Sequence, residues 1–571
     1  MNHINETIKD RRKAVVQLAA DKALELPLLP SGFWFHQDIR ENFYYAIHLF
    51  AYCNDQDFAC EWNDDKHETA RKLSLDMIRK ILALQVTDSD DAMYGHWPLF
   101  LGNHPSEAKA NPLTFEIIGC LLVLFYKKYG NELPSHVKKD CYLAIVHLYK
   151  SNIYRQPLKY MVHHGAKHTA LKLLLGSFFH DQELMDEGIK CAKQLRSHIE
   201  KFGFKEYGSL PWFWHWIQAF SCVWEVVENS EARNVISDLL DFLWGYRAGY
   251  YLKGTWVGPH SRQTLHDVPK DNNPLLDYIQ FGDFPLAEEI PRLEGSALLF
   301  YEVSDDIVKR AINRTKPVET KRKIQVANAD EIVAAELHTY VWIDPEFAVG
   351  GIWERVNEYE NEQHRWDITF PLTQENIENG VNQAFFFHPC EKDNPNDVRH
   401  TSNMGEVMYH KDTVMQLWSI PRNDKESYQG IIGCIPLGEW KFEASSGYGR
   451  IGNAYVSFQL MNEYRIEETN ERILIKSPFS SNWNGVIMEG ISSRDAAELG
   501  IHDLESFSAV IKEKSNSGFT TANLNTGHVE KVSVSYTSWR NDSLYFSMDR
   551  QGRCERFLDK QPVSFHDYKI I

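Results

Sequence analysis

The chain has 571 residues, 43% of them hydrophobic, and a net charge of −18, so it is expected to fold as two or three globular domains. The acidic balance argues against nucleic acid as a partner, because phosphate binding needs a basic face, but it permits an anionic sugar in a locally basic cleft. The longest apolar runs, such as 117–126, fall short of the roughly 20 residues of a membrane span, so no membrane association is expected.

The N-terminal segment and the cysteines both indicate the cellular compartment in which the protein is expected. The first 25 residues carry charges where a secretory signal would have its apolar stretch. The nine cysteines are odd in number and scattered, with no CxxC pair, so neither a disulfide framework nor a zinc ribbon is indicated. We therefore expect a cytoplasmic protein, or a secreted one only if a signal was removed.

Helical periodicity, with apolar residues at i, i+3, i+4 and i+7, continues to about residue 310. The clearest segments are 68–84, 114–128, 136–149, 166–179, 182–201, 211–227 and 231–246. Short links containing Gly, Pro, Asn and Asp separate them. Such a series is typical of a helical solenoid or an α/α toroid, and no repeat of roughly 34 or 40 residues is visible, which favours the toroid.

Beyond the helices the pattern changes twice. Residues 308–330 are charged and weakly patterned, so 311–330 is predicted as a linker. Short alternating segments then predict β-strands at 336–343, 347–356, 364–372, 381–388, 413–420, 455–460, 472–477, 485–491, 531–538 and 543–548, with one helical interruption at 493–512. The predicted fold is multidomain α+β: an (α/α) toroid (an incomplete α/α barrel) over 1–310 that carries the catalytic site, the linker, and an antiparallel β-sandwich over 331–571.

Five segments match motifs of one group of proteins. In the helical half they are ANPLTFEIIG (110–119), YGSLPWFWHWIQAF (207–220) and GTWVGPHSRQ (254–263); in the β half they lie at 344–371 and 485–513. In this order they resemble the heparinase II/III-like and chondroitin AC-type polysaccharide lyases. The resemblance implies a toroid followed by a sandwich and a lyase acting on an acidic polysaccharide or oligosaccharide. Two departures are Lys109, where the group usually has Asp, and the missing Asn–His–Tyr–Arg pattern of chondroitin AC lyases.

A uronate lyase works by β-elimination: it removes the proton at C5, beside the carboxylate, and expels the oxygen at C4. Asn, His or Arg must neutralise that carboxylate as enolate-like charge develops. A His or Tyr takes the proton, and a Tyr or His protonates the leaving oxygen. The search is therefore for these side chains at loop–helix junctions on one rim.

The start of the predicted helix near residue 160 supplies one such group. Tyr160, His164 and His168 lie there, and the i, i+4 spacing places His164 and His168 on one face. His164 is the first candidate for carboxylate binding or proton transfer, with Tyr160 and His168 as substrate contacts. The structural alternative is a capping cluster or a surface pair without a role.

A second group follows the helix that ends near residue 246. Gly-rich turns could present Tyr251 as base or acid, with His260, and Arg262 as a bidentate carboxylate ligand. Tyr246 and Trp256 are the associated substrate-binding candidates. The alternative is aromatic packing at the helix end, with Arg262 in a structural ion pair.

The remaining candidates are more dispersed. Asn111 is a catalytic candidate by the resemblance, although Asn before Pro is also an excellent helix N-cap. Trp212 and His215, one turn apart, are predicted to line the cleft. Two further sets are an N-terminal sugar platform and a sandwich trio: Trp34, His36, Asn42, Tyr44 and Tyr45; His364, Arg365 and Trp366.

Two other functions stay open. A glycoside hydrolase on an α/α toroid would use two carboxylates roughly 5–9.5 Å apart; the candidates are Glu41, Glu116, Asp267 and Asp277. A non-catalytic glycan-binding protein is the other. No cofactor is required by the chemistry, and a structural divalent metal in the sandwich would use His388, His400 and His410.

Overall fold

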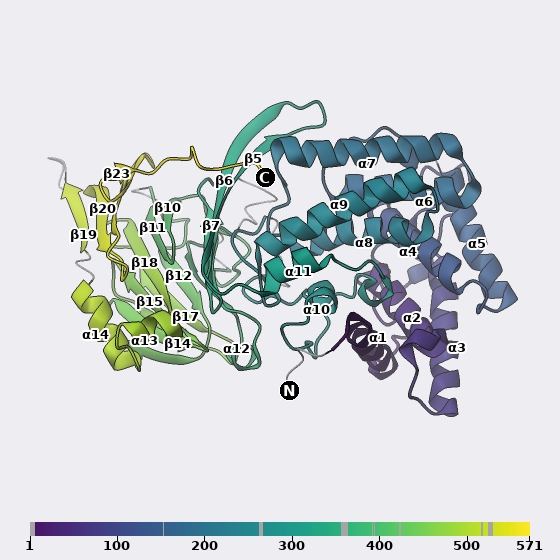
Figure 1. The fold of residues 1–571 in the computed structure, drawn as a ribbon, viewed down its shortest axis with the longest axis horizontal. Helices are drawn as coiled ribbons and strands as arrows, with labels where there is room; N and C mark the ends of the chain where they lie inside the picture. The colour runs from purple at the N-terminus through teal and green to yellow at the C-terminus, as the bar shows by residue number, and fades with distance from the viewer. Residues whose placement is uncertain are drawn as a thin grey trace.

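The computed structural model describes residues 6–151, 153–261, 267–355, 364–390, 392, 394–421, 424–514, 518–523 and 529–571. Helices occupy one end of the molecule and β-sheets the other (Figure 1). The α-helices of the first domain are α1 (Ile8–Glu25), α2 (Ile39–Asn54), α3 (Asp64–Leu82), α4 (Pro112–Tyr129), α5 (Ser135–Lys150), α6 (His163–Phe179), α7 (Gln182–Phe202), α8 (Leu210–Val226), α9 (Ser230–Gly249), α10 (Leu275–Gln280) and α11 (Asp305–Ile312).

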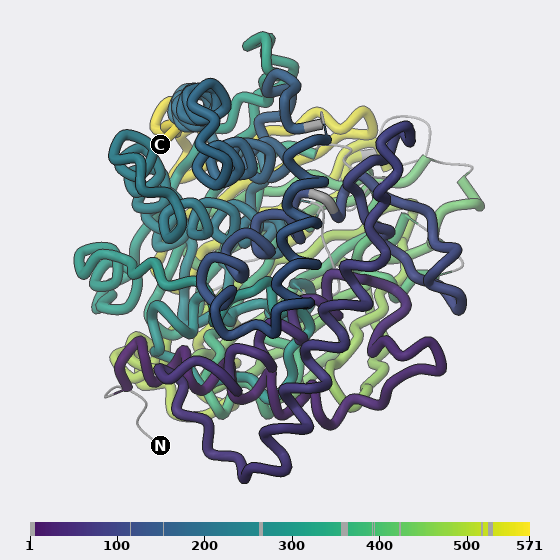
Figure 2. Tube along the Cα trace, turned by 90° about the vertical axis from the view of Figure 1, so that its right-hand side faces the viewer, coloured from purple at the N-terminus to yellow at the C-terminus, as the bar shows by residue number. Residues whose placement is uncertain are grey.

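The helices of the first domain form two layers. The inner helices α2, α4, α6 and α8 contact one another in that order, and outside them α3 contacts α5 and α7 contacts α9. Inner helix α8 is apolar around most of its circumference, whereas outer helix α7 buries a single stripe. Seen from the helical end, the purple N-terminal helices lie low and the blue helices lie above them (Figure 2). The predicted toroid is confirmed; among the described residues, no helix is both long and apolar enough to cross a bilayer.

Two antiparallel sheets pack face to face over one apolar core in the second domain. The eight-stranded sheet has the order β16 (Arg465–Glu468), β17 (Ile473–Pro478), β12 (Gly430–Ile435), β9 (Gln383–Phe387), β8 (Trp366–Thr369), β7 (Ala348–Ile352), β6 (Val333–Ile343) and β5 (Val318–Ala327). The six-stranded sheet has the order β10 (Gly405–His410), β11 (Thr413–Ser419), β18 (Trp483–Ser492), β15 (Ala454–Leu460), β14 (Ser446–Ile451) and β13 (Glu439–Phe442). The predicted sandwich is confirmed.

Smaller elements complete the chain. A five-stranded antiparallel sheet of β19 (Gly518–Asn523), β20 (Val529–Thr537), β21 (Ser543–Asp549), β22 (Cys554–Leu558) and β23 (Gln561–Pro562) follows α13 (Ser493–Glu498) and α14 (Leu504–Lys514). The short helix α12 (Gln374–Glu378) lies between β8 and β9 in the sequence. Two pairs of two-residue strands are also antiparallel: β1 (Trp97–Pro98) with β2 (Ala110–Asn111), and β3 (Tyr251–Leu252) with β4 (Thr255–Trp256).

The segment predicted as a linker is largely a strand. β5 pairs with β6 along its whole length, with a register shift between Val326 and Ala327. It is the outermost strand of its sheet, and charged residues such as Arg322 are common on exposed edges because they discourage pairing with other chains. The prediction of a 311–330 linker is therefore wrong over 318–327, and the link between the helices and the sheets is short.

Loops of the helical domain pair directly with the sandwich. The backbone N–H groups of His260 and His364 each donate to the other residue's carbonyl, at 3.1 and 3.0 Å. The Asp271 backbone N–H donates to Asn382 Oδ1 at 2.9 Å, and its carboxylate accepts from Asn382 and Gln383. These buried contacts fix the position of the sandwich against the loops of the helical domain.

Candidate active site

A pocket of about 480 Å³ opens at the N-terminal end of α6, and we call it the α6 pocket. The start of α4, the segment 156–160 and the first turns of α6 form its walls, through Pro112, Leu113, Glu116, Gln156, Pro157, Leu158, Lys159, Tyr160, His164, Gly165 and His168. It therefore brings together three of the side chains that the sequence singled out, Tyr160, His164 and His168. Tyr160 is 64% exposed.

The half-buried His164 is held by a carboxylate of another helix. Its Nδ1 lies 3.1 Å from Glu116 Oε2, and the same oxygen is 3.3 Å from Nζ of the buried Lys167. Burial alone would raise the pKa of Glu116, but the charge of Lys167 and the bond from His164 outweigh it and leave that pKa lowered. Glu116 is therefore ionised near neutral pH and stabilises the Nδ1–H tautomer of His164, whose Nε2 keeps its lone pair.

A layer of buried polar residues lies behind His164. The adjacent His163 donates its backbone N–H to Glu206 Oε2 at 2.7 Å, and its ring Nδ1 bonds to Glu206 Oε1. The ring of His163 is stacked on half-buried Trp212 at 5.0 Å. Burial lowers the pKa of His163 to about 4, so this ring is a neutral, fixed support for the pocket.

Deeper in the toroid, His215 belongs to an ion-pair network. Its Nε2 lies 3.3 Å from Glu294 Oε2, and Arg292 lies 2.5 Å from Glu294 Oε1. The Tyr44 hydroxyl donates to the same carboxylate at 3.1 Å. The pKa of Glu294 is lowered because Arg292 and His215 outweigh its burial. His215 is fully buried and is not among the residues that line the α6 pocket, so it is not the cleft residue that the sequence predicted.

Glu41 has the protonation behaviour of a general acid. Burial raises its pKa to about 8, in spite of the nearby charge of Arg292. Its side chain is half-buried on α2. Since a carboxyl group that keeps its proton at neutral pH can donate it, Glu41 remains a candidate for hydrolytic chemistry.

The structure gives Asn111 the role of a helix cap. Its Oδ1 accepts the Leu113 backbone N–H at 2.8 Å, one residue before α4 begins. The side chain is half-exposed beside the α6 pocket, but it is not among the pocket's lining residues. The capping interpretation accounts for its position.

The second predicted group does not form a site. Tyr251, Trp256 and His260 are all within 1% of complete burial, and the Tyr251 hydroxyl donates to Asp283. Tyr251 and Trp256 pack on aromatic side chains of the helical domain, and His260 packs on His364 of the sandwich, so none of the three reaches a ligand. Arg262 lies outside the described residues.

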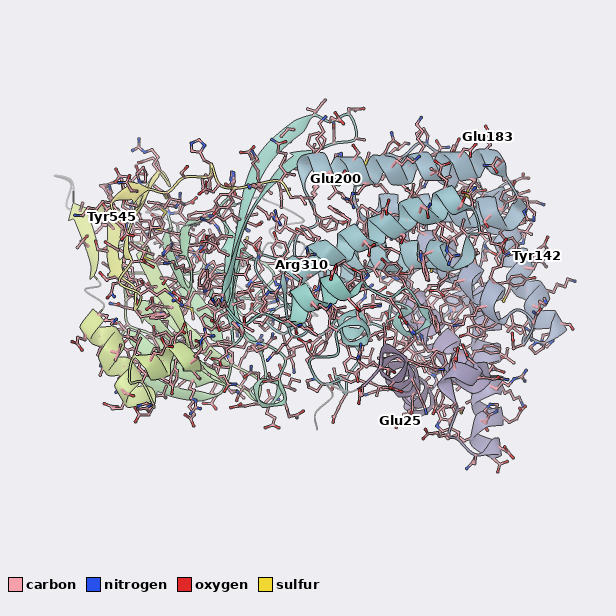
Figure 3. The ribbon with its side chains drawn as sticks, in the orientation of Figure 1. Glu25, Tyr142, Glu183, Glu200, Arg310 and Tyr545 are labelled. Carbon is pink, nitrogen blue, oxygen red and sulfur yellow. The ribbon has the colours of Figure 1, made fainter. Side chains whose placement is uncertain are left out.

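Tyr246 lines a different hollow. Its ring centre lies 5.2 Å from that of Phe204 and 5.1 Å from that of Tyr250, tilted against both. It borders a cavity of about 620 Å³ between α7, α9, α11 and β5. Glu200 and Arg310 also line this cavity (Figure 3). Tyr246 is therefore separate from the α6 pocket, because α9 carries it to the outer layer of helices.

The other predicted sets are buried. In the N-terminal strip only His36 is half-buried, and its Nε2 bonds to Ser31 Oγ at 2.6 Å; the rest are core residues of α2 and the turn before it. His364, Arg365 and Trp366 of the sandwich are buried. The two Asp candidates for a hydrolase, Asp267 and Asp277, are also buried. Alternating aromatic and polar residues look alike in sequence whether they face a cleft or a core.

The predicted metal ligands have protein partners. His388 bonds through Nδ1 to Ser402 Oγ at 2.6 Å and through Nε2 to the Tyr428 carbonyl at 2.7 Å. His410 bonds to Asp542 at 2.9 Å. Across the described part of the chain, no group of three or more His, Cys, Asp or Glu side chains is placed to hold a metal ion. A metal site with His388, His400 and His410 stays a prediction.

No protein-family model matches the chain, and no curated protein matches it. Two solved structures are similar over nearly its full length. Heparinase III shares 9% identity and a TM-score of 0.44, covering 98% of this chain and 92% of its own. Chondroitinase AC lyase, whose structures include oligosaccharide complexes, shares 11% identity and a TM-score of 0.40, covering 99% of both chains. Both carry the names of the lyase group that the sequence motifs resemble, at an identity and TM-score too low to extend their activities to this chain.

Proposed function

We propose that this protein cleaves a uronic-acid-containing glycan by β-elimination in the α6 pocket. The observation that supports it is the position of His164, which lines an open pocket with Tyr160 while Glu116 holds its Nδ1 at 3.1 Å. With Nδ1–H donated to Glu116, Nε2 is free to accept the C5 proton of a bound uronate.

The other lining residues supply the remaining roles. The Tyr160 phenol, at 64% exposure, is the proposed proton donor to the oxygen leaving C4. Lys159 lines the same wall and is the proposed counter-ion of the uronate carboxylate, whose negative charge grows as the proton is removed. The ion pair between Glu116 and buried Lys167 keeps the base of the pocket from repelling an anionic sugar.

A glycoside hydrolase is the second candidate, because one observation favours it. Glu41 has a pKa of about 8, and the pKa of nearby Glu294 is lowered; a protonated and an ionised carboxyl group are what such an enzyme needs. Glu294, however, is buried beneath Arg292 and His215, so it is less suited to reach a sugar than His164.

The first test is ultraviolet absorbance of the C4–C5 double bond that β-elimination creates, measured with hyaluronan, chondroitin, heparin and alginate, with and without a divalent metal. We expect absorbance to rise with at least one substrate. His164→Ala should lower kcat by about 10²- to 10⁴-fold, the usual contribution of a general base, and Tyr160→Phe should also lower kcat.

The control is His136→Ala, a surface histidine on α5, which should leave the rate unchanged. New reducing ends without absorbance would move the assignment to the hydrolase and Glu41. Full activity of His164→Ala would show that another residue is the base.

A further inference from the structure

A third hollow lies on the sandwich, in a different domain from the α6 pocket. It measures about 490 Å³ and is formed where β12 begins, beside β16 and β17 at the edge of the eight-stranded sheet. Six of its lining side chains carry the chemistry: Tyr428, Gln429, Glu463, Tyr464, Arg465 and Lys476. We call it the β16 hollow. Its volume lies within the usual range for small-ligand sites.

The polar lining has both signs of charge. Arg465 is exposed and makes no ion pair or side-chain hydrogen bond with any described residue. Lys476 lies at its cross-strand position, with Nζ 2.6 Å from Glu467 Oε2. Glu463 and Gln429 are exposed nearby, and the Gln429 amide nitrogen donates to the Asp424 and Ser427 carbonyls at 3.1 and 2.8 Å. The hollow therefore offers the Arg465 guanidinium as a donor and the Glu463 carboxylate as an acceptor within one wall.

The two tyrosines form a fixed aromatic part of the hollow. The ring of Tyr464 lies 5.5 Å from Phe458, and its hydroxyl donates to the Ser446 carbonyl at 2.8 Å. The half-buried Tyr428 packs against the core of the sandwich, and its backbone carbonyl accepts from His388 at 2.7 Å. Anchored rings of this kind lose little conformational freedom when a ligand binds.

This combination discriminates among ligand classes. A free phosphate or sulfate would meet Arg465 but also the carboxylates of Glu463 and Glu467, and an apolar ligand would bury these charges without partners. Sugar hydroxyls donate to a carboxylate and accept from a guanidinium, and the C–H face of a sugar ring packs on a tyrosine. The lining thus suits a saccharide better than either alternative.

We propose that the β16 hollow is an ancillary oligosaccharide-binding site, separate from the site of cleavage. That its ligand is a segment of the same uronate glycan rests on the proposed function. A long glycan would then be held at two places on one molecule, which raises its effective concentration at the α6 pocket. A disaccharide cannot span the two places, so loss of the hollow should weaken the overall affinity for a polymer and leave the affinity of the α6 pocket for a disaccharide unchanged.

Titration calorimetry with His164→Ala protein tests this, because the glycan is then bound without being consumed. The probes are polymeric hyaluronan, chondroitin, heparin and alginate, and the disaccharide of each. Adding Arg465→Ala should weaken binding of the preferred polymer by roughly tenfold and leave the affinity of the α6 pocket for its disaccharide unaffected. Tyr428→Ala should act in the same direction.

Lys139→Ala is the matched control, since it removes an exposed cation from α5 on the helical domain. Equal polymer affinity with and without Arg465→Ala and Tyr428→Ala would overturn the ancillary site, as would failure of all four polymers to bind. Loss of binding in these variants, in a protein that never forms the ultraviolet product, would support the site while rejecting the lyase. Formation of the ultraviolet product together with unchanged polymer binding in these variants would support the lyase while rejecting the ancillary site.

Discussion

At the scale of single residues, the geometry around His164 is set by a chain of two contacts. Lys167 is buried and lies 3.3 Å from Glu116, and Glu116 lies 3.1 Å from His164. Burying a lysine is costly unless an opposite charge is close, so Lys167 and Glu116 are retained as a pair. The consequence for the pocket is an imidazole with a defined tautomer and a fixed orientation.

Glu116→Gln tests whether that orientation matters. An amide can still accept from Nδ1–H, but it no longer carries the negative charge that stabilises a protonated imidazole. We expect kcat to fall by about tenfold or more, yet less than in His164→Ala. The ultraviolet assay measures kcat.

The control for this variant is Glu132→Gln, an exposed carboxylate after α4 that should not change kcat. An unchanged kcat in Glu116→Gln would mean that the charge of Glu116 does not act on His164.

The sequence predicted part of this site for a clear reason. Tyr160, His164 and His168 lie within nine positions of one another. Helical spacing brings His164 and His168 to one face of α6, and Tyr160 lies just before that helix. The bond from His164 to Glu116 spans 48 positions, and only the contact between α4 and α6 creates it. Tyr251 was misplaced because its side chain turns inward to Phe281 and Asp283, which lie about 30 positions away in the sequence.

At the scale of elements, the α6 pocket depends on a close approach within the first turn of α6. A Cβ added at Gly165 would lie 1.9 Å from the Tyr160 carbonyl oxygen and 3.1 Å from Leu158 Cδ1. The absence of a side chain at Gly165 therefore lets the segment 156–160 lie against the helix. That segment carries Lys159 and Tyr160 into the pocket.

Gly165→Ala should consequently displace the wall of the pocket. We expect kcat/KM to fall by roughly tenfold or more, because small misplacements of reacting groups are costly. The effect on Tm should be modest, since the displaced segment is largely exposed. Gly249→Ala is the matched control: nothing lies within 4 Å of a Cβ at that position, so activity and Tm should stay close to those of the unaltered protein. Equal activity of the two variants would contradict this account of the pocket wall.

Elements with a strong period were predictable and those without one were not. The helices from α3 to α9 match the predicted segments to within a few residues because their apolar spacing is regular. Strand β12 has the sequence GIIGCI and is buried on both faces, so it shows no alternation. Strand β16 has the sequence RIEE and is fully exposed at a sheet edge. Its mostly charged residues resemble those of a loop, so the sequence does not indicate a strand there.

At the scale of the whole molecule, the two domains meet around a buried carboxyl group that sequence could not place. Asp367 on β8 accepts from Thr369 Oγ1 at 2.5 Å and lies 2.9 Å from His364 Nε2. The ring of His260, from the helical domain, is 3.8 Å away. Burial lowers the pKa of both histidines to about 3, so near neutral pH no histidine cation balances this carboxylate.

Burial accordingly raises the pKa of Asp367 to about 7, although His260 and Thr369 act to lower it. In the unfolded chain an aspartate titrates near about 3.9. The folded protein therefore binds one more proton than the unfolded chain between these values, and the contribution of Asp367 to stability is lost as pH rises from about 4 to about 7.

Asp367→Asn should remove this dependence, because the amide resembles the protonated carboxyl group and does not ionise. We expect the variant's Tm, relative to that of the unaltered protein, to increase from pH 4 to pH 7 and then to level off. Asp90→Asn, an exposed aspartate, should show a constant difference over the same range. Thermal unfolding followed by circular dichroism at half-unit steps of pH measures both. A Tm difference for Asp367→Asn that does not vary with pH would mean that Asp367 stays ionised in the junction, with a cationic histidine beside it.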